Sequence, residues 1–436
     1  MALIYRRIKQ YKPFSAIRNI VEGFLITIVF LGPLTLFDVE VPREEQDYYE
    51  RVGERILMYN LTIEQYYEKR KHWVTSNLGT ILFKNQPIKY KPQNRTFTVL
   101  VYKHWHWFKH RHMTKKSFAT CSVNNCKFIG EDKLINSVDA VVVHMQQKKF
   151  PWVDKRNTTQ RWVFLTEESP IHTFIHPDPN ISDISNTYNW SMTYRSDSDV
   201  PIPYGRVVPI PEELMHEMAY DPITKHIPYW EQKQRKVLVA ALISHCNVPH
   251  RMNYIRELEK YIKVDIYGGC ASNLKMKNSC PGHTAADCPK LNKYLFYLAF
   301  ENSKCRQYLT EKVYHNAYDK GAIPIVMGPP VADCVKLLPP NSFLHVSAYD
   351  SPRELAMEIL YLSINDEYFE LFHKWRFYFS VINEHGFLGT TSLQLCRVCE
   401  ALNYNDNGTK VYDEESMKIY VDRNILCKIG QPYTCH

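Results

Sequence analysis

The sequence lacks internal repeats and low-complexity tracts throughout its 436 residues. It also lacks a strong charge bias, because 54 Lys and Arg residues against 46 Asp and Glu residues leave a formal charge of +8. This mild positive charge is no indication of nucleic-acid binding, but it suits an anionic small substrate. With 45% hydrophobic and 23% charged residues, wholesale disorder is excluded. The length suits two ordinary domains with additional segments.

The N-terminal region contains no acidic residue before position 20. The basic residues of this stretch are Arg6, Arg7, Lys9, Lys12 and Arg18. An apolar run at 20–37 follows, and then an acidic stretch at 38–47. This order predicts a cytoplasmic tail at 1–19 and one membrane anchor at 20–37, short enough for the thinner membranes of the early secretory pathway. No small-residue cleavage site follows, which favours an uncleaved anchor over a cleaved signal peptide.

No cysteine precedes Cys121, so all 12 cysteines lie beyond the predicted anchor. In an oxidising lumen, an even number fits complete disulfide pairing. N-x-S/T sequons, which are candidate glycosylation sites, begin at Asn60, Asn94, Asn157, Asn180, Asn189 and Asn407. Each sequon alone is a weak indication, but the anchor, cysteines and sequons together predict a protein of the secretory pathway.

The hydrophobic pattern predicts a helical stem at 38–92 and then two α/β domains, at 93–225 and 226–395. Strands are expected in the first domain at 96–102, 139–145, 161–167 and 191–195, and in the second at 236–244, 264–268, 294–302 and 322–328. Helices are expected at 249–263 and 308–321. Alternating strands and helices indicate parallel sheets, which bind ligands beyond the carboxyl ends of their strands.

The most informative stretch is FYLAFENSKCRQYLTEKVYHNAYDKGAIPIVMGPP at 296–330. It reads as strand, loop, helix and strand, with a helix beginning near Thr310. Backbone N–H groups at a helix start attract an anion, and Lys312 adds a positive charge there. Glu311 can accept hydrogen bonds from ribose hydroxyls. The pattern fits a nucleotide diphosphate, and equally a capped surface helix with a local Glu–Lys pair.

This stretch closely resembles the donor-binding motif of the α1,3-fucosyltransferase family, glycosyltransferase family 10, in FYLAFENS, YxTEK, NA and GxIPIVxG. RWVFLTEESPIH at 161–172 and NWSMTYRSDSDVPIPYG at 189–205 resemble further family blocks, and so do the residues at 236–263 with the DIYGGC that follows. The blocks occur in the family's order and extend over roughly 135–400. The resemblance implies the GT-B architecture, two Rossmann-like domains facing a cleft.

The resemblance implies transfer of L-fucose from GDP-β-L-fucose to the 3-hydroxyl of N-acetylglucosamine on glycoprotein glycans, with inversion at the anomeric carbon. DIYGGC and SFLHV (342–346) are more similar to enzymes of the invertebrate type that modify the innermost N-glycan residue. The alternative is a Lewis-type enzyme acting on Gal-GlcNAc or GalNAc-GlcNAc antennae, and a less favoured one is an inactive glycan-binding relative. The implied location is the Golgi membrane, single-pass type II with a lumenal catalytic domain, and no nucleic-acid partner is expected.

Inversion needs a carboxylate that takes the acceptor proton, and the resemblance assigns this role to Glu168. The adjacent Glu167 stays open as the alternative. The resemblance places donor-binding roles on Arg251, Asn302, Tyr308, Glu311, Lys312 and Tyr297. Among these, Arg251 and Lys312 would contact the diphosphate, Glu311 the ribose, and Asn302 would lie near fucose. For Tyr297, a place in the guanosine pocket and a place in the core are equally open.

Two patterns suggest metal ions. Asp197 and Asp199 form a D-x-D, but they lie in a family block for which a structural or acceptor-side role is favoured. The resemblance implies that no metal or other cofactor is required and leaves stimulation by Mn²⁺ open. The histidines of KHWHWFKHRHM have a spacing that could bind zinc or copper, although an exposed loop is favoured. They are His104, His106, His110 and His112.

A C-x-x-C motif at Cys396 and Cys399 could be a redox pair. The resemblance favours structural disulfides instead, tying a C-terminal tail at 396–436 to the domain. Cys121 with Cys126, and the loop that carries Cys270, Cys280 and Cys288, are predicted to form local disulfides. The sequence does not fix the connectivity.

Overall fold

The structure is a computed structural model that describes residues 63–86, 92–113, 121–154, 156–174, 178–282, 286–406, 408 and 410–427. The predicted anchor at 20–37 and the sequons at Asn60 and Asn407 lie outside these residues. Within the described ranges, no helix has the length and apolar character to cross a membrane. The chain divides into two compact units after Met58, and every described residue belongs to the second.

The first sheet has six parallel strands in the order β2-β1-β3-β4-β5-β6. They are β1 (Phe97–Tyr102), β2 (Cys126–Ile129), β3 (Ala140–His144), β4 (Arg161–Thr166), β5 (Trp190–Thr193) and β6 (Val200–Pro201). All four strands expected from the hydrophobic pattern are present. In register, His144 of β3 pairs with Leu165 of β4, so the residues after β4 emerge beside the end of β3.

The second sheet has five parallel strands in the order β12-β11-β10-β8-β9. They are β8 (Val239–Leu242), β9 (Val264–Tyr267), β10 (Phe296–Phe300), β11 (Ile323–Met327) and β12 (Leu344–His345). β10 and β11 are buried at every position, as expected for central parallel strands covered on both faces. The expected parallel α/β arrangement is therefore confirmed in both halves.

Helices cover the second sheet, and one is shorter than expected. α8 (Pro249–Leu258) and α12 (Pro352–Ile364) are in contact, burying Ile255, Leu258, Leu355, Ile359 and Leu362. The helix expected at 308–321 is only α10 (Glu311–Tyr314), followed by a 3-10 turn, η7 (Tyr318–Lys320). Thr310 caps α10, and Gly321 ends η7 with a left-handed φ of 66°. Other helices are α6 (Trp105–His112), α7 (Glu212–Met218), α9 (Leu274–Lys277), α11 (Val331–Leu337) and α13 (Asp366–Leu371).

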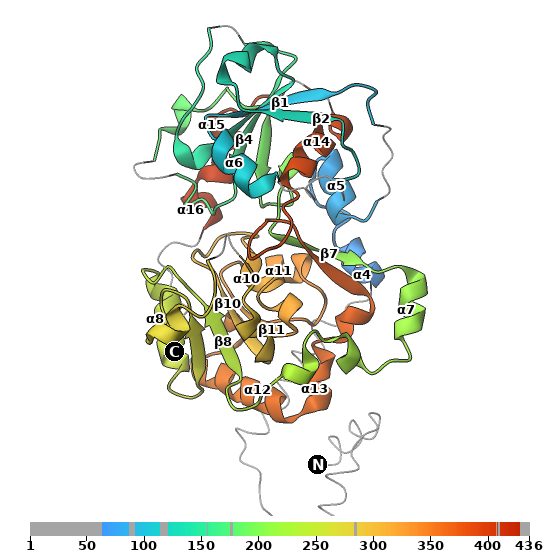
Figure 1. Ribbon diagram of the computed structural model, residues 1–436, viewed down its shortest axis with the longest axis vertical. Helices are drawn as coiled ribbons and strands as arrows, with labels where there is room; N and C mark the ends of the chain where they lie inside the picture. The colour runs from blue at the N-terminus through green and yellow to red at the C-terminus, as the bar shows by residue number, and fades with distance from the viewer. Residues whose placement is uncertain are drawn as a thin grey trace, which may run out of the picture. The chain divides into compact units, whose positions relative to one another are not determined.

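The last helices return to the first sheet (Figure 1). α14 (Gln394–Tyr404) contacts α5 (Asn77–Phe83) and β6, and it is followed by α15 (Glu414–Val421) and α16 (Arg423–Leu426). Tyr412, Met417 and Tyr420 belong to the core cluster around β3 and β4. The described part of the expected tail is thus an integral layer of the first half, because its apolar side chains complete that core.

Part of the expected stem is also integral to the fold. Tyr66 of α4 (Ile63–Glu68) donates a hydrogen bond to the carbonyl of Leu337 at 3.2 Å. Arg70 is buried, and it donates to the carbonyls of Lys336 (3.0 Å) and Phe83 (2.9 Å). Residues 63–86 therefore pack onto the globular part.

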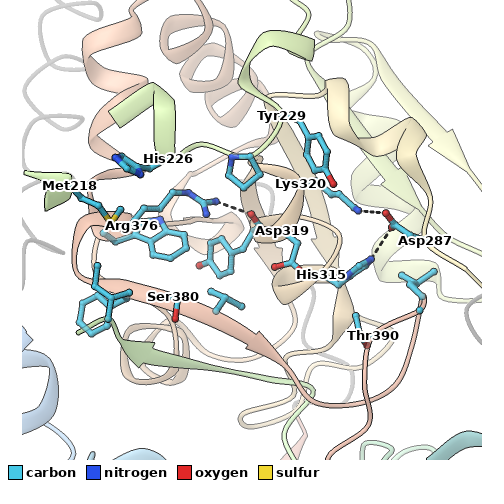
Figure 2. Close-up of a pocket in the computed structure, with 18 of the residues that line it drawn as sticks. Met218, His226, Tyr229, Asp287, His315, Asp319, Lys320, Arg376, Ser380 and Thr390 are labelled. Atoms are coloured by element: carbon cyan, nitrogen blue, oxygen red, sulfur yellow. Dashed lines mark hydrogen bonds and ion pairs between the residues drawn. The ribbon is translucent and has the colours of Figure 1, made fainter. Parts of the chain in front are cut away.

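A small antiparallel sheet joins β7 (Gly205–Pro209) to β13 (Phe379–Asn383), with Val207 opposite Val381. The sequence gives no indication of this pair, because its strands lie some 170 residues apart in the chain. Three residues of β13 form one wall of a cavity of about 640 Å³ (Figure 2). They are Phe379, Ser380 and Val381.

Five disulfides join described residues: Cys121–Cys396, Cys126–Cys399, Cys246–Cys270, Cys280–Cys288 and Cys305–Cys427. Cys334 is a buried free thiol, so the expectation that all cysteines pair is wrong. Cys435 lies outside the described residues. Of the local disulfides expected, Cys280–Cys288 is confirmed, whereas Cys270 pairs with Cys246 instead.

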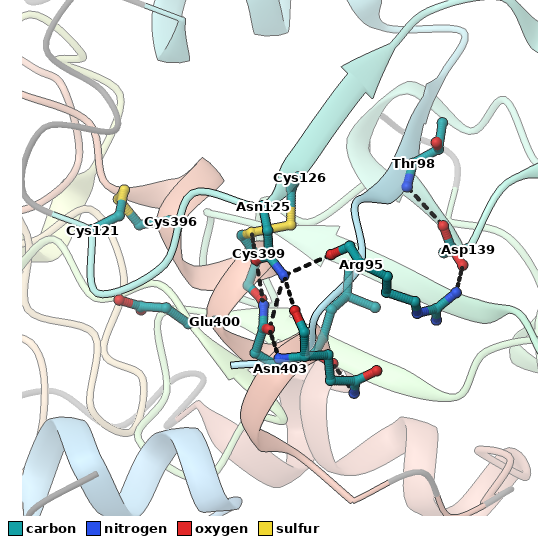
Figure 3. Close-up of a disulfide and its surroundings, with 12 residues drawn as sticks. Arg95, Thr98, Cys121, Asn125, Cys126, Asp139, Cys396, Cys399, Glu400 and Asn403 are labelled. Carbon is teal, nitrogen blue, oxygen red and sulfur yellow. Dashed lines mark hydrogen bonds and ion pairs between the residues drawn. A yellow bond between two sulfur atoms is a disulfide. The ribbon is translucent and has the colours of Figure 1, made fainter. Parts of the chain in front are cut away.

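The C-x-x-C motif does not close on itself. Cys396 and Cys399 lie one turn apart on α14 and share a face, from which they reach Cys121 and Cys126 (Figure 3). The local pairing expected for Cys121 and Cys126 is therefore wrong, and a redox pair is excluded. These two disulfides attach α14 to the first sheet and the loop before it.

Candidate functional site

Glu168 follows β4 at the carboxyl edge of the first sheet and is partly exposed. The hydroxyl of Tyr308 donates a hydrogen bond to its Oε2 at 2.9 Å. Burial raises the pKa of Glu168, and the charges of Glu167 and Glu311 add to the rise. The bond from Tyr308 and the charge of Lys312 oppose it, but the pKa remains raised. A carboxylate with a raised pKa is a more effective proton acceptor near neutral pH.

Glu167 is buried and surrounded by partners from distant elements. Arg111 of α6 donates to its Oε2 at 2.7 Å, His385 lies 3.1 Å from its Oε1, and Gln394 donates to Oε1 as well. Burial alone would raise the pKa of Glu167, but Arg111 and His385 hold it well below its usual range. Its oxygens are engaged in the fold, so the geometry favours Glu168 as the base.

The residues around Glu167 were not identified from the sequence. Tyr204 donates from its hydroxyl to the carbonyl of Glu167 at 3.2 Å, and its ring stacks on His385 with centroids 3.7 Å apart. Arg111 lies in the histidine-rich segment, which was expected to be a loop but forms the helix α6. His385 follows β13, and Gln394 is the first residue of α14. No local pattern links these positions, because only the fold brings them together.

Lys312 is held by two carboxylates and a hydroxyl. Its Nζ lies 3.2 Å from Glu301 and 3.0 Å from Glu311, and it donates to Thr310 Oγ1 at 2.9 Å. Burial disfavours the charged form of Lys312, but Glu301 and Glu311 raise its pKa above the usual value. The lysine therefore stays a cation beside Glu311.

Glu301 is a further member of this cluster that sequence analysis missed. It is completely buried, and it accepts hydrogen bonds at 2.9 Å from the backbone N–H and the hydroxyl of Thr310. Burial raises the pKa of Glu301, and Lys312 opposes the rise. The only feature of the sequence that could have identified Glu301 as a site residue was its position between Phe300 and Asn302, directly after the strand β10.

Arg251 lies in the first turn of α8 and is 2% exposed. Its guanidinium donates to the carbonyl of Phe300 at 3.2 Å and to the carbonyl of His245. Its Nε has no hydrogen-bond partner among the described residues. Burial lowers the pKa of Arg251, while Glu301 and Glu311 oppose this, so Arg251 shares the electrostatic neighbourhood of Lys312.

Two predicted donor-site residues have structural contacts. The Oδ1 of Asn302 accepts a hydrogen bond from Ser303 at 2.9 Å, and the Ser303 hydroxyl lies 2.7 Å from that of Ser169. Asn302 is thus tied to the segment that carries Glu168. Tyr297 is buried in the core, and its hydroxyl accepts from Leu242 N and Asn316 Nδ2, both at 3.1 Å. Of the two places left open for Tyr297, the structure supports the core.

The carboxylates of the D-x-D are engaged in the fold. Arg195 donates to Asp197 at 2.8 Å, and Asp199 accepts from Ser191 N (2.8 Å) and the hydroxyl of Tyr412 (2.7 Å). In the part of the chain that the structure describes, no group of three or more His, Cys, Asp or Glu side chains is placed to hold a metal ion. These contacts fit a structural role for Asp197 and Asp199, which is one of the two roles expected from the family block.

The histidine-rich segment is a helix, α6, rather than the exposed loop that was favoured. His106 and His110 are exposed on it, His104 is partly exposed, and His112 is buried with its Nδ1 2.5 Å from the hydroxyl of Ser392. Burial and the neighbouring His144 lower the pKa of His104 to about 4. The four rings thus have different surroundings and do not form one cluster.

The sequons differ in accessibility. Asn94, Asn157 and Asn180 are exposed. Asn189 is buried: its Oδ1 accepts from Trp162 N, and its Nδ2 donates to the carbonyl of Lys410, both at 2.9 Å. The buried amide leaves no space for a glycan, so the structure argues against Asn189 as a glycosylation site.

Comparison with known proteins assigns both halves to one family. Residues 230–417 match the family described as "Glycosyltransferase family 10 (fucosyltransferase) C-term", and residues 94–205 match "Fucosyltransferase, N-terminal". Alpha-(1,3)-fucosyltransferase 7 of Mus musculus is 31% identical over 340 residues, covering 74% of this chain and 76% of that protein. Glycoprotein 3-alpha-L-fucosyltransferase A of Drosophila melanogaster is 32% identical over 321 residues, covering 72% of this chain and 58% of that protein.

The chain is also similar to a solved structure, an α1,3-fucosyltransferase with GDP-fucose. The TM-score is 0.46 at 16% identity, covering 76% of this chain and 98% of that one. The likeness is too distant to carry residue roles across.

Proposed function

Because the chain belongs to the fucosyltransferases of glycosyltransferase family 10 and is therefore a glycosyltransferase, we propose that it transfers L-fucose from GDP-fucose in α1,3 linkage. The relatives from mouse and fly both carry α1,3-fucosyltransferase names. The observation that carries the proposal is the arrangement of Glu168, Tyr308, Lys312 and Arg251. It combines a carboxylate of raised pKa with two cations at the end of β10, the buried Arg251 and the partly buried Lys312.

The proposed reaction is a single in-line displacement with inversion. Glu168 accepts the proton of the acceptor 3-hydroxyl as its oxygen forms a bond to the anomeric carbon of fucose. The bond from that carbon to the diphosphate oxygen breaks, and the electron pair leaves with GDP. Lys312 and Arg251 stabilise the negative charge that develops on the diphosphate, with Glu311 on the ribose hydroxyls. Asn302 is proposed to face the fucose.

The proposed acceptor is the innermost N-acetylglucosamine of a glycoprotein N-glycan. Its support is the similarity of DIYGGC and SFLHV to core-modifying enzymes, together with the glycoprotein specified in the name of the fly relative. A Lewis-type reaction on antennae is the second candidate, because the name of the similarly related mouse protein specifies no acceptor. An inactive relative is disfavoured, since Glu168, Arg251, Glu311 and Lys312 are all present.

We further propose that the reaction needs no metal ion, because Arg251 and Lys312 supply the positive charge. Any stimulation by Mn²⁺ would then be indirect. The basic tail and apolar run support a single-pass type II protein of the Golgi membrane with a lumenal catalytic part. Activity that persists in EDTA, and co-localisation of the tagged chain with a Golgi marker, are the expected results.

The decisive experiment offers GDP-fucose with defined N-glycans and with Gal-GlcNAc, and determines the product linkage by NMR. Fucose in α1,3 linkage to the innermost N-acetylglucosamine is expected. A product only on Gal-GlcNAc would replace the core acceptor by the Lewis-type one. No product with any acceptor would overturn the enzymatic proposal.

A further inference from the structure

The cavity beside β13 lies outside the cluster of Glu168, Arg251 and Lys312. Its volume of about 640 Å³ lies within the range of small-molecule sites. Figure 2 shows Tyr229, Lys320 and Asp287 gathered on one side, and Met218, His226 and Arg376 on the opposite side. Nothing in the proposed reaction uses these residues.

The polar lining of the cavity suits a neutral ligand rich in hydroxyl groups. Asp287 and Asp319 leave about a third of their side chains exposed, whereas their cationic neighbour Lys320 is almost completely buried. Asp287 is paired with Lys320 and His315, and Asp319 with His315, so the charges of the lining largely compensate one another. An approaching ligand meets the exposed parts of these carboxylates, which accept hydrogen bonds from hydroxyls. The aromatic ring of Tyr229, 40% exposed at the rim, adds a flat apolar face with a polar edge. Together these groups have the chemistry that recognises a pyranose.

Two lining residues have a costly backbone conformation. Tyr229 and Leu388 have left-handed φ values of 57° and 53°, although neither is the Gly or Asn that favours this region. Strain of this kind persists where the surroundings hold it, and it concentrates at binding sites. At Tyr229 it keeps the ring at the rim, where Lys320 Nζ lies 5.7 Å from the ring centroid.

Two elements connect the cavity with the proposed reaction centre. The segment of α10 and η7 carries Glu311 at its start and the lining residue Lys320 at its end. β13 leads from Val381 in the cavity wall to His385, which contacts Glu167. The lining residues at 388–390 directly follow this contact. Two segments of the chain thus link the cavity wall to residues of the proposed reaction centre.

We propose that this cavity is a glycan subsite that binds pyranose residues of the acceptor remote from the residue that receives fucose. This inference rests on the proposed function, since it takes the acceptor to be a glycan bound near Glu168. The subsite would select extended glycans over short ones without taking part in proton transfer or donor binding.

The test uses the full chain with saturating GDP-fucose and two acceptors. One is an intact biantennary N-glycan, and the other is a two-sugar fragment that contains the same acceptor residue. For Tyr229→Gly, the KM for the intact glycan should rise about tenfold, while the KM for the fragment stays within about twofold. Glycine removes the ring and relieves the left-handed backbone, so the melting temperature should stay the same or rise. Tyr220→Gly is the matched control, because Tyr220 is 94% exposed and does not line the cavity.

Asp319→Asn is the second variant, and it should raise the KM for the intact glycan alone because it weakens an acceptor of hydroxyl hydrogen bonds. Equal changes with both acceptors, or none, would overturn the subsite. If the KM of a variant rises for a glycopeptide but not for the free glycan, the cavity binds peptide, and this result would also overturn the glycan subsite. Saturation-transfer NMR of the intact glycan provides a readout without turnover. If wild type transfers to no acceptor but Tyr229→Gly still loses this signal, the proposed function fails and the subsite stands.

Discussion

The hydroxyl of Tyr308 donates a hydrogen bond to Oε2 of Glu168 across 2.9 Å, although 140 residues separate the two in the chain. Tyr308 belongs to the loop before α10, which also supplies Glu301 and the N-cap Thr310. Glu168 follows β4 of the other sheet. The bond therefore ties the proposed base to the segment proposed to bind the donor, so that the position and the pKa of the base depend on both halves.

Tyr308→Phe removes this bond while keeping the ring. Because the bond stabilises the charged carboxylate, its loss should raise the pKa of Glu168 further. The acid limb of the kcat pH profile should then move to higher pH, with activity about tenfold lower at its acid end and less affected above neutrality. The profile is measured with saturating donor, so that weaker GDP-fucose binding does not contribute. An unshifted acid limb would argue against Glu168 as the titrating base.

Glu168→Gln should lower kcat by about a hundredfold or more while leaving the affinity for GDP and the melting temperature nearly unchanged. The reason is that the amide cannot accept the acceptor proton but preserves the shape of the side chain. Initial rates and calorimetric GDP titration measure the two effects. Substantial remaining turnover would move the base to another residue.

Glu167→Gln is the counterpart and should mainly destabilise the fold. Loss of the charge leaves Arg111 buried without its partner, a change that costs about 3 kcal/mol or more in comparable pairs. Since the pKa of Glu167 is depressed by folding, its stabilising contribution is fully present above its unfolded pKa of about 4.3 and is lost as pH falls through the folded value. The difference in unfolding free energy between wild type and variant should therefore shrink at low pH in urea titrations.

Lys312→Ala should weaken GDP binding by about tenfold or more, because a cation proposed to contact the diphosphate is lost. The variant also leaves Glu301 and Glu311 without their shared partner, so the melting temperature is measured in parallel. Lys290→Ala is the control, as Lys290 is exposed outside the cluster. Equal GDP affinity for Lys312→Ala and wild type would contradict a phosphate role.

Asn189→Gln should leave the electrophoretic mobility of the secreted or membrane-bound chain unchanged, whereas changing an occupied site among Asn94, Asn157 and Asn180 should increase it. The longer side chain cannot keep both hydrogen bonds of Asn189, so stability should fall by about 1–3 kcal/mol. Glycosidase treatment followed by gel electrophoresis, with thermal unfolding, provides both readouts. A mobility shift for Asn189→Gln would show that this sequon is modified.

Cys126→Ser tests the attachment of α14 to β2. Loss of the Cys126–Cys399 disulfide, which closes a segment of 273 residues, should lower the stability by about 2–5 kcal/mol. Peptide mapping without reduction should recover Cys126 with Cys399, and Cys121 with Cys396, in wild type. A peptide containing an internal Cys396–Cys399 bond would contradict the structure.

The sequence by itself was sufficient to predict individual strands, and sites whose residues are neighbours in the chain. Buried strands such as 139–145 and 322–328 are recognisable because short apolar runs rich in Val and Ile favour central parallel strands. The block at 296–330 predicted the neighbourhood of Glu311 and Lys312 for the same reason, since both lie within one turn of the capping Thr310.

The tertiary structure decided the relationships that no local pattern encodes. Glu167 and Glu168 are the same residue type and adjacent in the chain, but their partners differ. Arg111 and His385 lower the pKa of Glu167, whereas Glu168 accepts a hydrogen bond from Tyr308 and keeps a raised pKa. The disulfide partners of α14 and the cavity beside β13 likewise depend on segments far apart in the chain. The sequence specifies such contacts only through the packing of the whole fold, because burial and the distance to a partner, not residue type, set the charge and the role of each group.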